Sequence, residues 1–442
     1  MNGGKLPEGW VETPLENIVE ILDSMRIPVN NKERQKRIEG KDFNKLYPYY
    51  GATGEVGKID DFIFDEELIA LGEDGVPFFD GQKNKAYMLY GKTWVNNHAH
   101  VLKAIQGLSH NKFLCYFLNQ FDYHDYVNGG TRLKLTQANM RKIPVRFAPF
   151  SEQKIIAEKL DTLLAQVDST KARLEQIPQI LKRFRQVVLA AIVNGKLSTN
   201  TEQWKVYSLK NLCVSISDGD HQAPPKSETG IPFLVISDVN KGKIDLENVS
   251  RWVPESYYLA LKEIRKPSLN DILYTVTGSF GIPVVVNTTK PFCFQRHIAI
   301  IKPNSNLINY RFLLFYLESP QIFKHASDVA TGTAQKTVSL SSLRNFELSV
   351  PSLKEQAVIV HRVEQLFAYA DTIENQVNNA LTRVNNLTQS ILAKAFRGEL
   401  TAQWRAENPS LISGENSATA LLERIKAERA ASSGKKSSRK KA

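Results

Sequence analysis

The chain has 442 residues, of which 42% are hydrophobic and 23% charged, a composition typical of a globular protein with two or three domains. There is no run of 18 apolar residues and only three widely spaced cysteines, which argues against a membrane helix, a disulfide framework and a zinc site. The net charge of +11 suits a nucleic-acid binder but does not require one.

The first 150 residues form a segment of mixed pattern, with short apolar runs broken by Gly, Pro and Asn. This pattern predicts a globular domain that contains both strands and helices. Its start, MNGGKLPEGWVETP, lacks the apolar core of a signal peptide, so we expect a cytoplasmic protein. His98 and His100 could ligate a metal, but no further Cys/His cluster supports this, and a packed or capping role is the more ordinary one. The acidic pairs at 60–61 and 73–74 could be paired carboxylates, but a role as turn residues explains them sufficiently.

Residues 151–197 have the pattern of one long helix, with apolar residues that step by four and three in strict alternation. This spacing predicts a coiled-coil seam. Ser151 is the N-cap candidate, and Gly195 stands where a left-handed C-terminal residue is wanted. Pro178 is expected to bend or split the helix. About 40 helical residues would span roughly 60 Å.

Residues 198–352 predict a second mixed domain whose landmarks match those of the first. The matches pair GEDGVP at 72–77 with GSFGIP at 278–283, NHAHVLK at 97–103 with RHIAIIK at 296–302, NKFLCYFLN at 111–119 with YRFLLFYLE at 310–318, and Gly130-Thr131 with Gly332-Thr333. The two domains are therefore expected to share a fold while their loops differ. Loops that vary on a shared scaffold usually carry recognition.

Residues 353–405 predict a second long helix, in which the seam of the first recurs 203 positions later. Ser352 and Glu355 form a capping box at its start. The seam residues are Ile156, Leu160, Leu163, Val167, Leu174, Ile177, Leu181, Phe184 and Val188 in the first helix, and Ile359, Val363, Leu366, Ile373, Val377, Val384, Leu387 and Ile391 in the second. Equal length and matching phase indicate that the two helices pack on each other. A rod that dimerises two chains is the alternative.

One short phrase occurs three times, as GKLPEGW at 4–10, GKLSTNTEQW at 195–204 and GELTAQW at 398–404. Three copies indicate a repeat cut partway through its cycle, so that the two chain ends meet. Antiparallel helices would explain this closure, whereas parallel helices would not. The predicted fold is α+β, with two mixed α/β domains, two long antiparallel coiled-coil helices and a pseudo-twofold circular repeat. Residues 406–442, which end in GKKSSRKKA, are expected to form a disordered basic tail.

Several strings resemble the specificity subunits of type I restriction–modification systems. They are YPYYGATGEVGKIDDFIFDEELIALGEDG at 47–75, WVNNHAHVL at 94–102 and IPFLVISDVNKGKID at 231–245. The helix text from 151 to 186 is similar to that of the enterobacterial type IA class. Together with the domain–helix–domain–helix order and the circular repeat, the resemblance covers residues 1 to about 405.

The resemblance implies a bacterial, non-catalytic DNA specificity subunit. Residues 1–150 and 198–352 would be target-recognition domains, each reading one half of an asymmetric bipartite site in double-stranded DNA. The helices would set the spacer and dock two modification subunits that methylate adenine, with two restriction subunits joining them. No cofactor is implied in this chain; S-adenosylmethionine, ATP and Mg²⁺ would belong to the partner subunits, and no membrane is involved.

The contacts to DNA are expected from loops with Lys, Arg, Asn and Gln, mostly to phosphates. The densest basic stretch is NNKERQKR at 30–37, for which a solvated helix face is the alternative. The candidates are Lys32, Arg34, Lys36, Arg37, Lys83, Lys85, Arg132 and Lys134 in the first domain, and His221, Lys226, Lys241, Lys243, Gln335 and Lys336 in the second.

The sequence contains no complete catalytic motif among the candidates. APPK at 223–226 is not the N/D-P-P-Y/F loop of an adenine methyltransferase. GKT at 91–93 is not a phosphate loop, because Ala86 stands where glycine is required. A self-contained modifying enzyme and a coiled-coil scaffold that binds only proteins remain the competing hypotheses.

Overall fold

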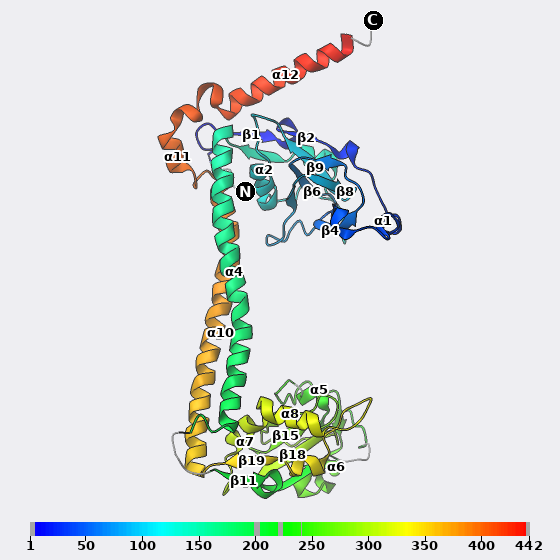
Figure 1. Cartoon of the computed structure of the whole chain (residues 1–442), viewed down its shortest axis with the longest axis vertical. Coiled ribbons are helices and arrows are strands. Elements are labelled where there is room, and N and C mark those ends of the chain that lie inside the picture. Colours follow the sequence, from blue (N-terminus) through cyan, green and yellow to red (C-terminus); the bar gives the residue numbers. More distant parts are fainter. Residues whose placement is uncertain (1–4, 199–203, 220–223, 240, 439–442) are drawn as a thin grey trace. The chain divides into compact units, whose positions relative to one another are not determined.

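The computed structural model describes residues 5–198, 204–219, 224–239 and 241–438 (Figure 1). The chain divides into two compact units. The first unit comprises residues up to 175 and from 379 onward, and the second comprises residues 176–378. Each unit contains one mixed α/β domain and parts of both long helices. Among the residues described, no helix is long and apolar enough to cross a membrane.

A four-stranded antiparallel sheet forms the centre of the domain in each unit, with the same strand order in both. In the first unit the order is β2 (Val19–Ile21), β9 (Ala99–Ala104), β6 (Leu68–Gly72), β7 (Ala86–Leu89). In the second it is β12 (Cys213–Asp218), β18 (Ile298–Pro303), β15 (Ile272–Thr275), β16 (Pro283–Val285). The central strand β6 is a continuous apolar run that is buried on both faces. Its alternate side chains, Ile69 and Leu71 against Leu68 and Ala70, enter two separate cores.

Each unit also has a second sheet, and these two sheets correspond as well. In the first unit the order is β4 (Gly54–Ile59), β3 (Tyr47–Gly51), β8 (Lys92–Val95), β5 (Phe64–Asp65); in the second it is β14 (Trp252–Val253), β13 (Ile231–Leu234), β17 (Cys293–Phe294). The pairs β3–β8 and β13–β17 are parallel. Two-stranded antiparallel pairs join β1 (Val11–Pro14) to β10 (Pro144–Phe147) and β11 (Lys205–Ser208) to β19 (Glu347–Val350). The predicted common fold of the two domains is therefore confirmed.

Short helices complete the domains. The α-helices are α1 (Asn31–Ile38), α2 (Asn111–Gln120) and α3 (Gln137–Arg141) in the first, and α5 (Ile236–Val239), α6 (Glu255–Ala260), α7 (Tyr310–Leu317), α8 (Pro320–Val329) and α9 (Leu340–Arg344) in the second. The 3₁₀ turns are η1 (Leu15–Asn17), η2 (Asp23–Met25), η3 (Phe43–Lys45), η4 (Leu209–Leu212) and η5 (Glu263–Arg265). Helices α2 and α7 are the matched landmarks at 111–119 and 310–318. Helix α7 is followed by α8, which has no counterpart after α2. Ser319 caps α8, and Pro320 occupies its first turn.

The long helices α4 (Phe150–Val193) and α10 (Leu353–Phe396) contain 44 residues each. In the first unit, Ile156 near the start of α4 shares a core with Ile391 near the end of α10. In the second unit, Val188 near the end of α4 shares a core with Ile359 and Val363 near the start of α10. The two helices therefore run antiparallel, as predicted.

Two details of the predicted helices are wrong. Helix α4 begins at Phe150, so Ser151 lies inside the first turn instead of capping it. The helix continues through Pro178, so of the two effects expected of this proline, a bend or a split, the split does not occur. Leu387 is 46% exposed, while Thr388 beside it is half-buried. An α-helix has 3.6 residues per turn, so its buried face drifts away from a strict seven-residue repeat, and here it moves from 387 to 388.

The two chain ends meet at Glu152, whose carboxylate is fully buried in the first unit. The Trp10 indole donates to Oε2 (2.8 Å), the Thr401 hydroxyl donates to Oε1 (2.6 Å) and the Arg405 guanidinium donates to Oε1 (2.5 Å). In the second unit Glu355, 203 positions later, accepts from the Ser198 hydroxyl (2.8 Å). Segments from both chain ends in the first unit thus take the place of the single segment after α4 in the second, and the predicted circular closure is confirmed.

The prediction of a disordered tail is wrong for the described part of it. Helix α11 (Ala402–Glu407), the turns η6 (Pro409–Leu411) and η7 (Gly414–Asn416), and helix α12 (Ala418–Ser438) follow α10. Ala418, Leu421, Leu422 and Ile425 lie on one face of α12 at helical spacing and join the main core of the first unit. The abundance of Lys and Arg in this segment concealed that apolar face. Residues 439–442 lie outside the described residues.

Candidate nucleic-acid interface

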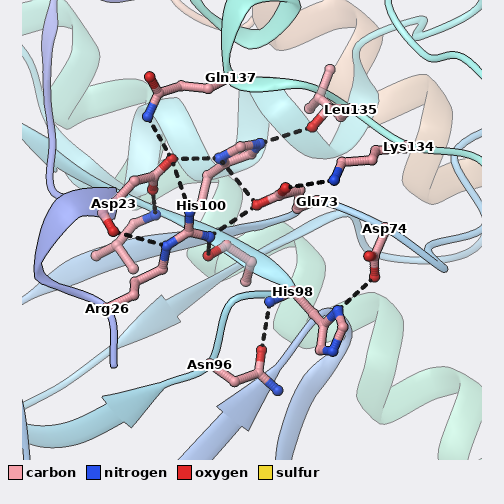
Figure 2. A network of polar contacts seen from close by, with 12 residues as sticks. Asp23, Arg26, Glu73, Asp74, Asn96, His98, His100, Lys134, Leu135 and Gln137 are labelled. Carbon is pink, nitrogen blue, oxygen red and sulfur yellow. Dashed lines mark hydrogen bonds and ion pairs between the residues drawn. The ribbon is translucent and has the colours of Figure 1, made fainter. Parts of the chain in front are cut away.

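A network of polar side chains lies at one end of the central sheet in the first unit (Figure 2). It starts at Asp23, which follows β2 and is buried. Asp23 accepts hydrogen bonds from the Val101 amide (2.9 Å) and the Gln137 amide side chain (2.9 Å), and His100 Nδ1 lies 2.7 Å from its Oδ2. The other ring nitrogen of His100 lies 2.9 Å from the Leu135 carbonyl oxygen. His100 is therefore a packed residue with an oxygen partner on each side.

Two consecutive carboxylates after β6 extend this network. Glu73 forms ion pairs with Arg26 (3.0 Å) and Lys134 (3.2 Å). Asp74 pairs with His98 (2.9 Å) and Arg132 (2.9 Å). We call Asp23, Arg26, Glu73, Asp74, His98, His100, Arg132 and Lys134 the carboxylate network. Its three carboxylates balance the charge of its two Arg and one Lys side chains. The ion pairs therefore fix the positions of these basic side chains at a partly exposed surface.

Burial would raise the pKa of Asp23, but the opposing interactions outweigh it. The hydrogen bond and charge of His100, the Gln137 side chain and the Val101 amide together hold the pKa of Asp23 below its usual range. The Asp23 carboxylate is therefore ionised at neutral pH and anchors the network. Arg26 also donates to the carbonyl oxygens of Asp23 (3.1 Å) and Ala99 (2.7 Å).

The second unit has an equivalent site with different side chains. A pocket of about 410 Å³ there is lined by Asp218, Val276, Thr277, Arg296, His297, Gln335, Thr337, Val338, Ser339 and Leu340. The shared strand pairing aligns Glu73 with Val276 and His100 with Ala299, so the charged core of the network has no counterpart. Burial and then the nearby Arg296 lower the pKa of His297. One scaffold therefore presents two chemically different surfaces.

An exposed loop borders each of these sites. In loop 128–134 the amides and carbonyls of Asn128 and Lys134 bond to each other (2.8 and 3.0 Å). In loop 331–337 the backbones of Thr331 and Thr337 do the same at the same two distances. The backbone after the adjacent strand also contacts each loop, from the Gly75 amide to the Leu133 carbonyl (3.2 Å) and from the Gly278 amide to the Lys336 carbonyl (3.0 Å). The two loops thus have a common backbone frame.

The predicted match of Gly130 with Gly332 is wrong by one residue. Gly129 has φ +112° and Gly332 has φ +111°. A Cβ at either position would lie 2.4 or 2.3 Å from the carbonyl oxygen three residues later, which only glycine avoids. Gly129, not Gly130, is therefore the counterpart of Gly332, and Arg132 is the counterpart of Gln335.

The structure separates the predicted DNA contacts of the first domain into packed and exposed groups. Lys85 is only 2% exposed and donates to the Asp80 carbonyl (2.5 Å), so its prediction as a DNA contact is wrong. Burial lowers the pKa of Lys85. The Arg34 and Arg37 guanidinium groups lie over the rings of Tyr49 and Trp94. The remaining candidates, Lys32, Lys36, Lys83, Arg132 and Lys134, are exposed.

Lys83 belongs to a loop that contacts α10 within the first unit. The Gln82 side chain donates to the Asn385 carbonyl (3.4 Å), and the Gln389 side chain donates to the Gly81 carbonyl. In the second domain Gln335 and Lys336 lie on loop 331–337, and Lys226, Lys241 and Lys243 are exposed elsewhere. His221 lies outside the described residues.

Arg26 and Asp23 are not among the residues predicted from the sequence. Asp23 begins a short 3₁₀ turn and Arg26 directly follows it, and neither belongs to a recognisable motif. His100 was the available signal. A buried histidine needs polar partners for its ring nitrogens, and Asp23 at the end of β2 is one of them. Within the part of the chain that the structure describes, no three or more His, Cys, Asp or Glu residues are grouped to hold a metal ion.

Comparison with known proteins shows which family has these features. The profile described as the type I restriction modification DNA specificity domain matches residues 7–179 and 201–383. The specificity subunit of the type I restriction enzyme EcoBI of Escherichia coli is 52% identical over 316 aligned positions, covering 66% of each chain. The EcoKI specificity subunit of Escherichia coli K12 is 40% identical over 483 aligned positions, covering 100% of both chains.

Solved structures show the same fold at low identity. The HsdS subunit from Thermoanaerobacter tengcongensis has a TM-score of 0.59 at 18% identity, covering 90% of this chain and 99% of its own. A chain from a structural study of complex assembly and conformational transition in the type I R-M system has a TM-score of 0.63 at 18% identity, covering 90% of this chain and all of its own. The predicted fold class is confirmed.

Proposed function

The chain belongs to the type I restriction modification DNA specificity family, and on that premise we propose that each of its two globular domains reads one half of a bipartite DNA target. Proteins of this family are specificity subunits, so the chain is a DNA-recognition component and not itself an enzyme. Loops 128–134 and 331–337 carry the proposal. They have one backbone frame but different side chains, as two readers of different half-sites would require.

We propose further that the long helices fix the length of the unread spacer between the half-sites. Both domains continue directly into a long helix, at Phe150 and at Leu353, and a helix transmits position rigidly. Exposed Lys and Arg side chains around each loop would neutralise phosphates and set the register, while a few side chains reach base edges. Because the loops differ, the two half-sites would differ in sequence.

The partners we propose are two modification subunits and two restriction subunits. The junctions at Glu152 and at Glu355 are equivalent, and equivalent surfaces on one chain suit two copies of one partner. The modification subunits would methylate adenine with S-adenosylmethionine, and the restriction subunits would use ATP and Mg²⁺. This chain would bind none of those cofactors itself.

The proposal can be tested by mapping methylated adenines in DNA exposed to the chain with its modification subunits. We expect modification at one asymmetric bipartite sequence, and salt-sensitive, sequence-selective binding by the complex. We expect neither methylation nor cleavage by the purified chain alone. Methyl transfer by the isolated chain would instead identify a self-contained enzyme, and a complex without sequence-selective DNA binding would identify a protein scaffold.

A further inference from the structure

We propose that residues 132 and 335 are equivalent base-reading positions, at which Arg132 reads a guanine in one half-site and Gln335 reads an adenine in the other. The inference rests on the proposed function, because it assumes that each domain reads one half-site. It adds what that function leaves open, namely which side chain selects a base and which base it selects.

The first argument is the equivalence of the two positions. Arg132 and Gln335 each lie three residues after the left-handed glycine of their loop, and in each loop the glycine packs against that residue's carbonyl. Both loops close through a reciprocal pair of backbone hydrogen bonds. Both are then followed by a capped helix, with Thr136 capping α3 and Ser339 capping α9. The two backbones therefore hold different side chains at one site.

The second argument is accessibility on a fixed backbone. The Arg132 side chain is 65% exposed, and Gln335 is exposed as well. Each loop is tied to the turn after the central strand, through the amides of Gly75 and Gly278. A side chain that is exposed at its tip and fixed at its backbone can enter a groove without a large cost in ordering.

The third argument is the chemistry of the two side chains. Arginine forms paired hydrogen bonds with guanine O6 and N7, whereas glutamine forms them with adenine N6 and N7. Among the described residues, Asp74 is the sole ion-pair partner of Arg132, through Nη2 (2.9 Å). No described residue forms a hydrogen bond with the Gln335 side chain. Both groups therefore retain polar atoms that can face a base.

Asp74 favours a base over a phosphate as the partner of Arg132. The carboxylate already offsets the charge of the guanidinium, so attraction to a phosphate is weakened. Paired hydrogen bonds to the neutral edge of guanine need the fork of donors but not the full charge. Asp74 is thus a positioning residue that orients Arg132. In the second domain Thr277 is the counterpart of Asp74, and its hydroxyl accepts a hydrogen bond from the Thr337 hydroxyl (3.2 Å). Gln335 is uncharged, so no carboxylate is needed there to offset its charge.

The other basic candidates of the first domain fit this role less well. Arg34 and Arg37 lie over aromatic rings, and Arg37 also donates to Asp60 (2.6 Å). Lys134 is paired with Glu73 (3.2 Å) and offers a point charge without a fork of donors. Arg132 alone among these combines an exposed fork with a matched position in the second domain.

The test uses the complex of the full chain with its modification subunits. Competition binding with duplexes that carry each single base change, together with methylation mapping, gives the preference at every position of the target. Arg132→Ala should lower discrimination by about 10- to 100-fold at one base pair of one half-site only, the range of one paired contact. Arg132→Gln should move the preference there from guanine to adenine, and Gln335→Ala should act only in the other half-site.

Arg397→Gln is the matched control. Arg397 is also an exposed arginine in an ion pair, here with Glu399 (2.6 Å), but it lies outside the loop, just after α10. We expect its target to match that of the parent chain. Asp74→Asn should weaken selectivity at the base pair read by Arg132 without moving it, and Asp74→Glu should restore part of that selectivity. Equal thermal unfolding midpoints would confirm that all the variants fold.

The outcomes separate this inference from the proposed function. If Arg132 and Gln335 variants weaken binding equally for every sequence, these residues contact phosphates and the inference is overturned. If the variants keep the parental target and affinity, it is overturned as well. In both cases the parent complex still reads a bipartite site and the proposed function stands. A parent complex that shows no sequence preference would overturn the proposed function itself.

Discussion

Glu152 is the residue on which three distant segments depend. It is fully buried and accepts hydrogen bonds from Trp10, Thr401 and Arg405, which come from the two ends of the chain. A buried carboxylate is tolerated only when hydrogen-bond donors satisfy its oxygen atoms. The donors, in turn, need the carboxylate as their acceptor.

Replacing Glu152 with alanine should therefore destabilise the first unit by about 3 kcal/mol or more, because Arg405 would be left in a buried place without its anion. Urea denaturation of the full chain measures this change. Arg397→Ala is the control, since it removes an exposed pair with Glu399 and should leave the denaturation midpoint unchanged. Equal effects of the two substitutions would show that the junction does not hold the chain ends.

The lowered pKa of Asp23 predicts how the first unit responds to acid. Its folded pKa lies below the unfolded value near 4, so the stabilisation is complete above about pH 4 and is lost as the pH falls through the folded pKa. The free energy of unfolding of the parent chain should fall in this window, and Asp23→Asn should fall less steeply. Urea midpoints measured between pH 3 and pH 6 test this. Parallel curves would mean that His100 and Gln137 do not stabilise the ionised form.

Helix α12 shows at the scale of an element how the end of the chain is anchored. Leu421 and Leu422 are nearly fully buried against the core of the first unit. Replacing either with alanine should destabilise that unit by about 2–3 kcal/mol, because each change leaves a cavity. Glu423→Ala, on the exposed face, should have little effect. Thermal unfolding of the three variants distinguishes a docked helix from a loosely attached tail, for which all three would behave alike.

The seam between the long helices provides a second comparison at this scale. Leu160 is fully buried. Leu387 was expected from the seven-residue repeat to be buried in the same seam, but it is 46% exposed. Leu160→Ala should cost about 2–5 kcal/mol and Leu387→Ala under about 0.5 kcal/mol. Urea denaturation measures both. Similar losses would show that Leu387 packs in the seam as fully as Leu160 does.

For the whole molecule, the proposed role of the helices predicts that their length sets the DNA spacer. Residues 171–177 of α4 and 374–380 of α10 are matching heptads, and removing both keeps the antiparallel register. Seven residues correspond to about 10 Å of helix, or up to about three base pairs of DNA. Methylation mapping should show a shorter spacer between unchanged half-sites. An unchanged spacer would contradict the proposal, and Leu387→Ala, which keeps the helix length, is the control.

The order of domains and helices, the phase of the helix seam and the meeting of the chain ends can all be predicted from the sequence. These features are encoded locally, as a helical period, a capped boundary or a phrase repeated at a fixed offset, so reading along the chain recovers them. Even the error at Leu387 follows from a local rule, since the strict repeat ignores the drift of a real helix.

The polar residues that form the surface at the end of each sheet could not be predicted in the same way, because they are brought together only by folding. Asp23 and His100 are 77 positions apart, and Asp23 and Gln137 are 114 apart, so no local pattern joins them. The burial of Lys85 and the docking of α12 likewise depend on what the rest of the chain places beside them. Local pattern fixes which elements form, but the accessibility and partners of a charge depend on packing between segments distant in sequence.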